Sequence, residues 1–322
     1  MTVSRVINRS GYISQDARVR VEAAIAELEY VPNTLANSLR FKQTKTLALI
    51  LTDITNPFFT TLARGVEDVA SDAGFSVIFC NTDESEIEQD EHLTVLMKKR
   101  VDGILLVPAE STAASMAFVR QRTVPVVVLD RRVPNGGMDT VRCDSEQGAY
   151  ELTRLLLKLG HTRIAMLSGP PGVSTAADRV AGYRRAMVEA GAPLDEALIF
   201  SGLFTQAGGR SMTEAAFCLN PPPTALFAGN NLIAIGAYRA TREAGLRIPE
   251  DVAMVAFDDL PPALVLEPFL TVAAQPAYEM GRKATELLLA RLAGKLPPEC
   301  QEIVLPTELV VRRSSGDKLV RA

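Results

Sequence analysis

The sequence predicts an α/β protein made of two tandem, doubly wound parallel-sheet subdomains, preceded by a small all-α head. From Lys45 onward, short apolar runs alternate with longer amphipathic stretches. The runs have four to six residues rich in Val, Ile and Leu, as expected for strands buried on both faces. The alternation restarts near residue 144, which divides the body into halves of roughly 100 and 130 residues.

The first half is predicted to contain four strands with helices between them. The strands are expected at 47–51, 77–80, 103–107 and 124–129, and the helices at 62–73, 86–99 and 113–121. The second half continues with helices at 146–159, 181–189, 234–243 and 279–292, and strands at 164–168, 225–228 and 252–257. Two such sheets in tandem leave a cleft between them, and ligands favour the carboxyl ends of parallel strands.

Residues 1–44 have a different pattern. Residues 2–8 are predicted to form a helix that ends before Gly11, and Ser14 is placed to cap a second helix. In that second helix an apolar stripe is formed by Val21, Ala24, Ile25 and Leu28. A third helix at 34–41 is too short to be stable alone, so it either folds on contact with a partner or is an ordinary linker.

Composition excludes several classes of protein. The four cysteines, Cys80, Cys143, Cys218 and Cys300, are too far apart for a zinc site or a disulfide framework, which favours reduced thiols in the cytoplasm. The chain has two histidines, and we expect no metal and no cofactor. No run of 18 apolar residues is present, and the N-terminus does not have the pattern of a secretory signal, so we expect no membrane partner.

Enzymatic motifs are also missing from the sequence. Residues 53–56 follow the first strand where a Gly-rich phosphate loop would stand, and there is no Ser/His/Asp order. Net charge is −4, but residues 1–45 carry seven basic against four acidic side chains. A basic head on an acidic body is a weak sign of a nucleic-acid-binding arm, and ordinary scatter of surface charge explains it equally well.

Several motifs in order along the chain resemble the lactose-repressor (LacI/GalR) family of transcriptional regulators. In the head, the motifs are 2–8, 25–33 and 35–39. In the body, they are 53–59, 100–104, 160–164, 179–183, 257–259 and 305–310. Because these matches cover essentially the whole chain, the sequence is identified as a member of this family.

The resemblance implies a domain organisation. Residues 1–32 would be a partial helix-turn-helix head, 33–44 a hinge helix, and 45–322 a body with the type I periplasmic-binding-protein fold. The first subdomain would comprise about 45–143 plus 276–301, and the second about 144–275 plus 302–322. Compared with the family, the chain starts inside the recognition helix, so we expect about fifteen to seventeen further residues upstream; the alternative is a product that binds DNA poorly.

The resemblance places DNA contacts in the head and the hinge. Thr2, Ser4, Arg5 and Asn8 map onto groove-facing positions, where Arg5 would pair with a guanine edge rather than be a solvated surface charge. Leu39 aligns with the leucine that wedges between base pairs in the minor groove, although a packing pair with Leu35 is the plain alternative. Arg40 would then lie at the minor groove or its phosphates.

The pattern predicts that Asn56 is the N-cap of a helix and that Pro57 is its first residue. This places Phe58 and Phe59 at a helix start at the mouth of the cleft. Aromatic rings there suit a sugar ring, but an isolated pair of phenylalanines is more often part of a core.

By resemblance to ribose-binding periplasmic proteins, ten residues fall on ligand positions. Carboxylates among them would accept from hydroxyl groups, guanidinium groups would donate in forks, and amides would do both. Taken singly, each charged member would more often be a surface ion pair. The ten effector-binding candidates are Asn56, Phe58, Phe59, Asp130, Arg131, Arg179, Phe204, Asn230, Asp258 and Gln275.

These expectations define a function. We expect a homodimeric, cytoplasmic repressor that binds palindromic operator DNA and releases or gains it when a monosaccharide such as ribose closes the cleft. A purine or a sugar phosphate remains an alternative effector. A stand-alone sugar-binding protein that has lost operator binding, a transport-type sugar receptor and a glycosidase are the competing functions.

Overall fold

The computed structural model describes residues 2–7, 11–28, 43–112, 124–134, 136–260 and 268–316. Residues 1–44 and 45–322 form two units, which are treated separately. The predicted helix at 113–121 and the predicted hinge helix lie outside the described residues. Within the described part, no helix is both long and apolar enough to cross a lipid bilayer.

The described part of the head contains two helices, α1 (Thr2–Ile7) and α2 (Gln15–Glu27). The hydroxyl of Ser14 accepts a hydrogen bond of 3.4 Å from the backbone N–H of Ala17, which confirms the predicted cap. No residue of α2 is buried, so its apolar stripe is not a core in the described head. Val3, Val21, Ile25 and Leu28 instead line a depression on the surface of this unit.

The first subdomain is built on a six-stranded, fully parallel sheet with the order β11-β5-β4-β3-β1-β2. Its strands are β1 (Thr46–Leu51), β2 (Ser76–Asn81), β3 (Gly103–Leu106), β4 (Val126–Leu129), β5 (Asp139–Cys143) and β11 (Glu302–Leu305). Its described helices are α4 (Pro57–Asp72), α5 (Glu86–Lys98) and α11 (Ala277–Leu292).

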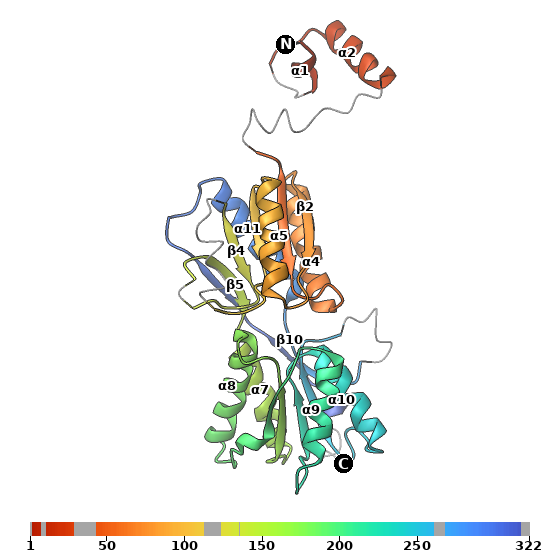
Figure 1. Cartoon of the computed structure of the whole chain (residues 1–322), viewed down its shortest axis with the longest axis vertical. Helices are drawn as coiled ribbons and strands as arrows, with labels where there is room; N and C mark the ends of the chain where they lie inside the picture. The colour runs from red at the N-terminus through yellow and green to blue at the C-terminus, as the bar shows by residue number, and fades with distance from the viewer. Residues whose placement is uncertain are drawn as a thin grey trace. The chain divides into compact units, whose positions relative to one another are not determined.

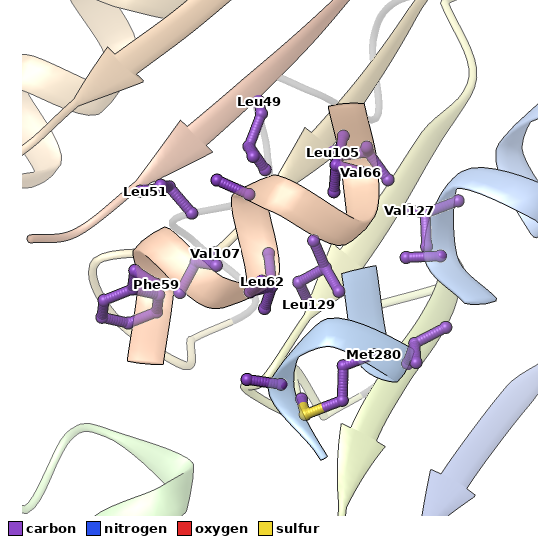
Figure 2. Packing of buried hydrophobic residues seen from close by; sticks show 14 of the residues in the cluster. Leu49, Leu51, Phe59, Leu62, Val66, Leu105, Val107, Val127, Leu129 and Met280 are labelled. Carbon is purple, nitrogen blue, oxygen red and sulfur yellow. The ribbon is translucent and has the colours of Figure 1, made fainter. Parts of the chain in front are cut away.

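The core of this subdomain lies on both faces of the sheet. Leu47, Leu49 and Leu51 of β1 pack with α4 and α11, whereas Ala48 and Ile50 pack with α5. This alternation follows from the two-residue repeat of a strand. Figure 2 shows the α4 and α11 side, where side chains of both helices meet those of the strands. The sheet is therefore covered twice, as its uninterrupted apolar strands predict.

The second subdomain repeats the plan with the sheet order β12-β10-β9-β8-β6-β7, in which only β12 runs antiparallel to its neighbour. Its strands are β6 (Ile164–Ser168), β7 (Ile199–Ser201), β8 (Ala225–Ala228), β9 (Ala253–Phe257), β10 (Thr271–Ala274) and β12 (Glu308–Val310). Its helices are α7 (Ser145–Lys158), α8 (Ser174–Glu189), α9 (Gln206–Phe217) and α10 (Asn231–Glu243). In each subdomain the helices lie against the strands (Figure 1).

The chain passes three times between the two sheets, after β5, after β10 and after β11. The predicted fold class is confirmed by the two sheets and their helices. The expected boundary between 301 and 302 is wrong by a few residues, because β11 pairs with β5 and so belongs to the first sheet. The third crossing is therefore made at Pro306 and Thr307, between β11 and β12.

Candidate functional site

All ten candidate effector-binding residues line one cavity between the two subdomains. They lie at the carboxyl ends of the parallel strands and at the starts of the following helices, where ligands bind in such sheets. Three further residues that we did not predict also line it: Asp53, Glu84 and Thr175. Asp53 and Glu84 are polar residues that closely follow β1 and β2, and this position is the signal that could have found them.

The start of α4 is built as predicted. The Asn56 side chain accepts a hydrogen bond of 3.0 Å from the N–H of Phe58, and Pro57 is the first residue of the helix. The rings of Phe58 and Phe59 are 5.0 Å apart in an edge-to-face arrangement. Both are buried in the apolar cluster of the first subdomain and also line the cavity, so they belong to the core and to the cavity wall at once.

A third ring, Phe204, comes from the second subdomain. It lies directly against Gly169, where an added Cβ atom would stand 2.1 Å from the ring carbon Cζ. Only a residue without a side chain allows the ring this close to the backbone that follows β6. Aromatic surface is therefore contributed to the cavity by both subdomains.

Asp130 and Asp258 occupy the same place in the two halves. Each follows the last residue of a central strand, and each has a left-handed backbone, with φ of 63° and 67°. Each backbone N–H donates to the next strand, from Asp130 to the carbonyl of Val141 and from Asp258 to that of Ala273. Non-glycine residues adopt this conformation at a cost, and such positions cluster at functional sites.

Burial raises the pKa of Asp130 to about 6. The nearby Arg179 and Arg131 act to lower this pKa, whereas Asp258 acts to raise it further. Burial also raises the pKa of Asp258, while Arg179 and the hydrogen bond from Gln275 act in the opposite direction. Gln275 Nε2 donates to Asp258 Oδ1 at 2.6 Å. The two carboxyl groups thus lie in a polar site with little water. Binding a neutral ligand with hydroxyl groups there costs less free energy than binding a ligand that adds a further charge.

Arg131 departs from the expectation that its fork is free for a ligand. Its Nη1 and Nη2 atoms each donate to a carboxylate oxygen of Glu84 at 2.6 Å. Nη1 also lies 2.7 Å from the carbonyl oxygens of Pro108 and Ala109. The fork is therefore occupied within the protein.

Arg179 is held by Phe257 and by the backbone. Its guanidinium carbon lies 3.8 Å from the centre of the Phe257 ring, and Nη1 donates to the carbonyl of Gly229 at 2.7 Å. Next to that carbonyl, the Asn230 side chain caps α10 by accepting from the N–H of Ile233 at 2.8 Å. These contacts fix both cavity residues in place.

Four buried polar atoms of the cavity residues have no hydrogen-bond partner among the described residues. They are two acceptors, Asp130 Oδ1 and Gln275 Oε1, and two donors, the Nε atoms of Arg131 and Arg179. Buried polar groups are nearly always hydrogen-bonded, so such a group needs an explanation. The cavity residues therefore have both accepting and donating capacity that the described residues do not use.

The edge of the cavity is bridged by polar contacts between the subdomains. The N–H of Arg132 donates to Ser174 Oγ at 2.7 Å, and the N–H of Ser174 donates to Ser111 Oγ at 2.9 Å. Arg132 also pairs with Asp178 of α8 at 2.5 Å. The structure is thus closed around the site.

The DNA-binding candidates are described only in part. Arg5 lies exposed on α1. Thr2 and Ser4 are on the same helix, but their side chains lie outside the described residues, as do Asn8, Leu39 and Arg40 entirely. Among the residues that are described, no group of three or more His, Cys, Asp or Glu side chains is arranged to hold a metal ion.

Two family models match the chain. Residues 44–302 match periplasmic binding proteins and the sugar-binding domain of the LacI family, and residues 1–33 match bacterial regulatory proteins of the lacI family. Each of the following curated relatives aligns with 98% of the chain. The HTH-type transcriptional regulator DegA of Bacillus subtilis is 36% identical, with 94% of its own length aligned. The ribose operon repressor of Escherichia coli is 37% identical and the repressor PurR of Photobacterium profundum 32%, each with 95% aligned.

Solved structures show the same similarity. The complex of the transcriptional regulator CelR with cellobiose superposes with a TM-score of 0.78 at 34% identity, covering 97% of this chain and 94% of that one. A regulator from Enterococcus faecium with bound ribose gives 0.74 at 32% identity, covering 84% and 98%. The lac repressor dimer bound to operator gives 0.86 at 26% identity, covering 98% and 94%.

Proposed function

Because the chain belongs to the LacI family of bacterial regulatory proteins, we propose that it is a cytoplasmic repressor whose operator affinity is set by a free monosaccharide, such as ribose. The observation that carries the choice of ligand is the cavity, where four carboxyl groups, three side-chain amides and three aromatic rings converge. The four unpartnered polar atoms add a need for both donors and acceptors, which a sugar meets.

A purine is the second candidate, favoured by the similarity to the repressor PurR. A flat base needs stacking and a few edge contacts, whereas here polar groups come from both subdomains. A sugar phosphate is disfavoured by charge. The cavity is lined by four carboxylates, Asp53, Glu84, Asp130 and Asp258, and by two guanidinium groups.

We further propose that the protein works as a homodimer on palindromic DNA. Phe79 of β2 and Ile87 and Val95 of α5 are large apolar side chains exposed on neighbouring elements of the first subdomain, as expected of a surface that pairs with a second copy. Effector binding between the subdomains would change their relative rotation, and the two heads would be coupled to that change.

Calorimetric titration tests the ligand. D-ribose, other free sugars, ribose 5-phosphate, hypoxanthine and guanine are titrated into the full chain and into the Asp258→Ala variant. We expect a free sugar to bind, and the variant to bind it about ten- to a hundredfold more weakly. Tight binding of a purine without any response to free sugars would reject the monosaccharide.

Operator binding is tested separately. Candidate operators are selected from random duplex DNA by the protein, and affinity is then measured with and without the sugar found above. We expect specific binding that responds to the sugar. Sugar binding without any sequence-specific DNA binding would favour the stand-alone sugar-binding alternative.

A further inference from the structure

We propose that Glu84 determines effector specificity, because it occupies the fork of Arg131 and so denies that cation to phosphorylated ligands. This inference rests on the proposed effector site. Glu84 follows β2 and lines the cavity, but it was not among the residues expected to do so. Its role is to reserve the site for neutral ligands.

The ion pair between the two side chains is bidentate. Both N···O distances are 2.6 Å, and the Arg131 side chain is only 2% exposed. Parallel hydrogen bonds of this kind are among the strongest that carboxylates make, and they match the geometry with which a guanidinium group would otherwise hold a phosphate. A phosphoryl group at Arg131 would therefore have to displace Glu84.

The loop that carries Glu84 is held in an unusual conformation. Asp83 and Glu84 both have left-handed backbones, with φ of 47° and 61°. The Asn81 side chain fixes this loop, since Nδ2 donates to Asp83 at 2.6 Å and Oδ1 accepts from the N–H of Ile54 at 2.7 Å. Two consecutive left-handed residues other than glycine cost conformational free energy, so the surrounding contacts must hold the loop, and with it Glu84, in place.

The second guanidinium group does not replace the first as an anion site. Arg179 is stacked on Phe257 and donates to the carbonyl of Gly229. It also lies close enough to Asp130 and Asp258 to affect the pKa of both carboxyl groups. An incoming dianion would thus meet one cation already balanced by Glu84 and another beside two carboxyl groups.

Arg131 has supports that do not depend on Glu84. Nη1 also contacts the carbonyl oxygens of Pro108 and Ala109, so removal of the carboxylate should leave the guanidinium group near its place. Its Nη2 atom would then be released toward the cavity. This makes a change of specificity, rather than a general loss of binding, the expected result.

The test compares Glu84→Gln with the wild type in the full chain. D-ribose, ribose 5-phosphate and inorganic phosphate are titrated by calorimetry, and thermal unfolding is recorded for each variant. We expect Glu84→Gln to bind ribose 5-phosphate at least about tenfold more tightly than the wild type does, while ribose affinity does not rise. Glu84→Asp, whose side chain is one methylene group shorter, should weaken the ion pair and show a smaller gain, and it decides the question if Glu84→Gln does not fold.

Glu196→Gln is the matched control. Glu196 also accepts from a guanidinium fork, that of Arg184, at 2.9 and 2.5 Å, but neither residue lines the cavity. This variant removes one negative charge and frees a fork away from the site, so we expect its affinity for ribose 5-phosphate and phosphate to change by less than about threefold. An equal gain in Glu196→Gln, or no gain in folded Glu84 variants, overturns the role of Glu84.

The outcomes also separate this inference from the proposed effector. If wild type binds ribose and the Glu84 variants gain no affinity for ribose 5-phosphate or phosphate, the effector stands and the role of Glu84 falls. If wild type ignores free sugars but the Glu84 variants gain anion binding, the monosaccharide falls and the role of Glu84 stands. Wild type that binds ribose 5-phosphate more tightly than ribose contradicts both.

Discussion

Asn231 Nδ2 donates a hydrogen bond of 2.9 Å to Asn56 Oδ1, and this bond joins the second subdomain to the first. Both side chains are buried. Asn56 caps α4 and Asn231 is the first residue of α10, so the bond connects two helix starts that also carry cavity residues. Together with the contacts of Arg132 and Ser174, it stabilises the closed arrangement of the subdomains.

Asn231→Ala should therefore shift the free protein toward an open cleft. Nitroxide labels on Cys218 of the second subdomain and Cys300 of the first, both exposed, report their separation by double electron–electron resonance. The half-buried Cys80 is replaced by Ser, and labelled chains are diluted with unlabelled ones. We expect a longer or broader distance distribution, and about two- to tenfold weaker binding of the sugar, since less protein is in the competent state.

Thr241→Ala is the control for this measurement. Thr241 is buried on the same helix, but its hydroxyl donates to the carbonyl of Ala237 within α10. It should leave the label separation unchanged. Identical distance distributions for Asn231→Ala and wild type would show that the bond has no part in closure.

Asp130→Asn should change how the free energy of unfolding depends on pH, compared with wild type. Burial raises the pKa of Asp130 from 3.8 to about 6. Between pH 3.8 and about pH 6, the folded protein therefore holds a proton on this carboxyl group that the unfolded chain does not hold. The ionised carboxylate therefore lowers the stability of wild type: this penalty is full above about pH 6, decreases as pH falls from about 6 toward 3.8, and is lost below that value. Because Arg179, Arg131, Asp258 and Glu84 also act on the group, we expect the variant to be more stable by about 1–2 kcal/mol near neutral pH.

Urea unfolding at about pH 7.5 and about pH 5 measures this difference. The stability advantage of Asp130→Asn should fall by roughly half between these two pH values, and its affinity for the sugar should be lower. An advantage of the same size at both values would show that the carboxyl group is not protonated on acidification.

Gly169→Ala should damage the cavity through Phe204. The added Cβ atom would lie 2.1 Å from the ring, so the ring must leave its place. We expect at least about tenfold weaker sugar binding, from lost aromatic contact. In Gly172→Ala the new Cβ atom meets nothing within 4 Å, and this control should bind as wild type does. Unchanged affinity in a folded Gly169→Ala protein would remove Phe204 from the site.

Arg5→Ala tests the predicted contact with DNA. If the exposed Arg5 pairs with a guanine edge, its loss should weaken operator binding by about 1–3 kcal/mol and relax the preference at one base pair. Arg18→Ala on α2, also exposed, provides a basic control in the same unit. Fluorescence anisotropy with operator variants measures both. A uniform loss across all sequences would assign Arg5 to a phosphate instead.

Central strands could be predicted from sequence because burial on both faces makes them uninterrupted apolar runs, as in Gly103–Leu106. Strands β5, β7 and β11 could not: β5 alternates buried with half-buried residues, β11 alternates exposed with half-buried ones, and β7 has three residues. Helix α9 was also missed, since its two consecutive glycines weaken the helical pattern.

The residues of the cavity were predicted by resemblance, but their bonding was not. The occupied fork of Arg131 depends on Glu84, 47 residues earlier in the chain, and on a loop with two left-handed residues that are not glycine. No short sequence pattern predicts a loop of this conformation. The bond between Asn56 and Asn231 likewise joins residues 175 positions apart, and only the closed arrangement of the two sheets brings them together.

The short crossing at Pro306 and Thr307 limits how the protein can respond to its effector. β11 and β12 are hydrogen-bonded into different sheets, yet two residues separate them, so this connection has almost no length to spare. Sliding or pulling the sheets apart would break strand pairing, whereas a rotation about the three crossings would not. Atoms beside the crossings must move least, and displacement must grow with distance from them. An effector in the cavity would therefore act by rotating one subdomain relative to the other. The displacement at any other point of the body would depend on its distance from the crossings rather than on the flexibility of the chain at that point.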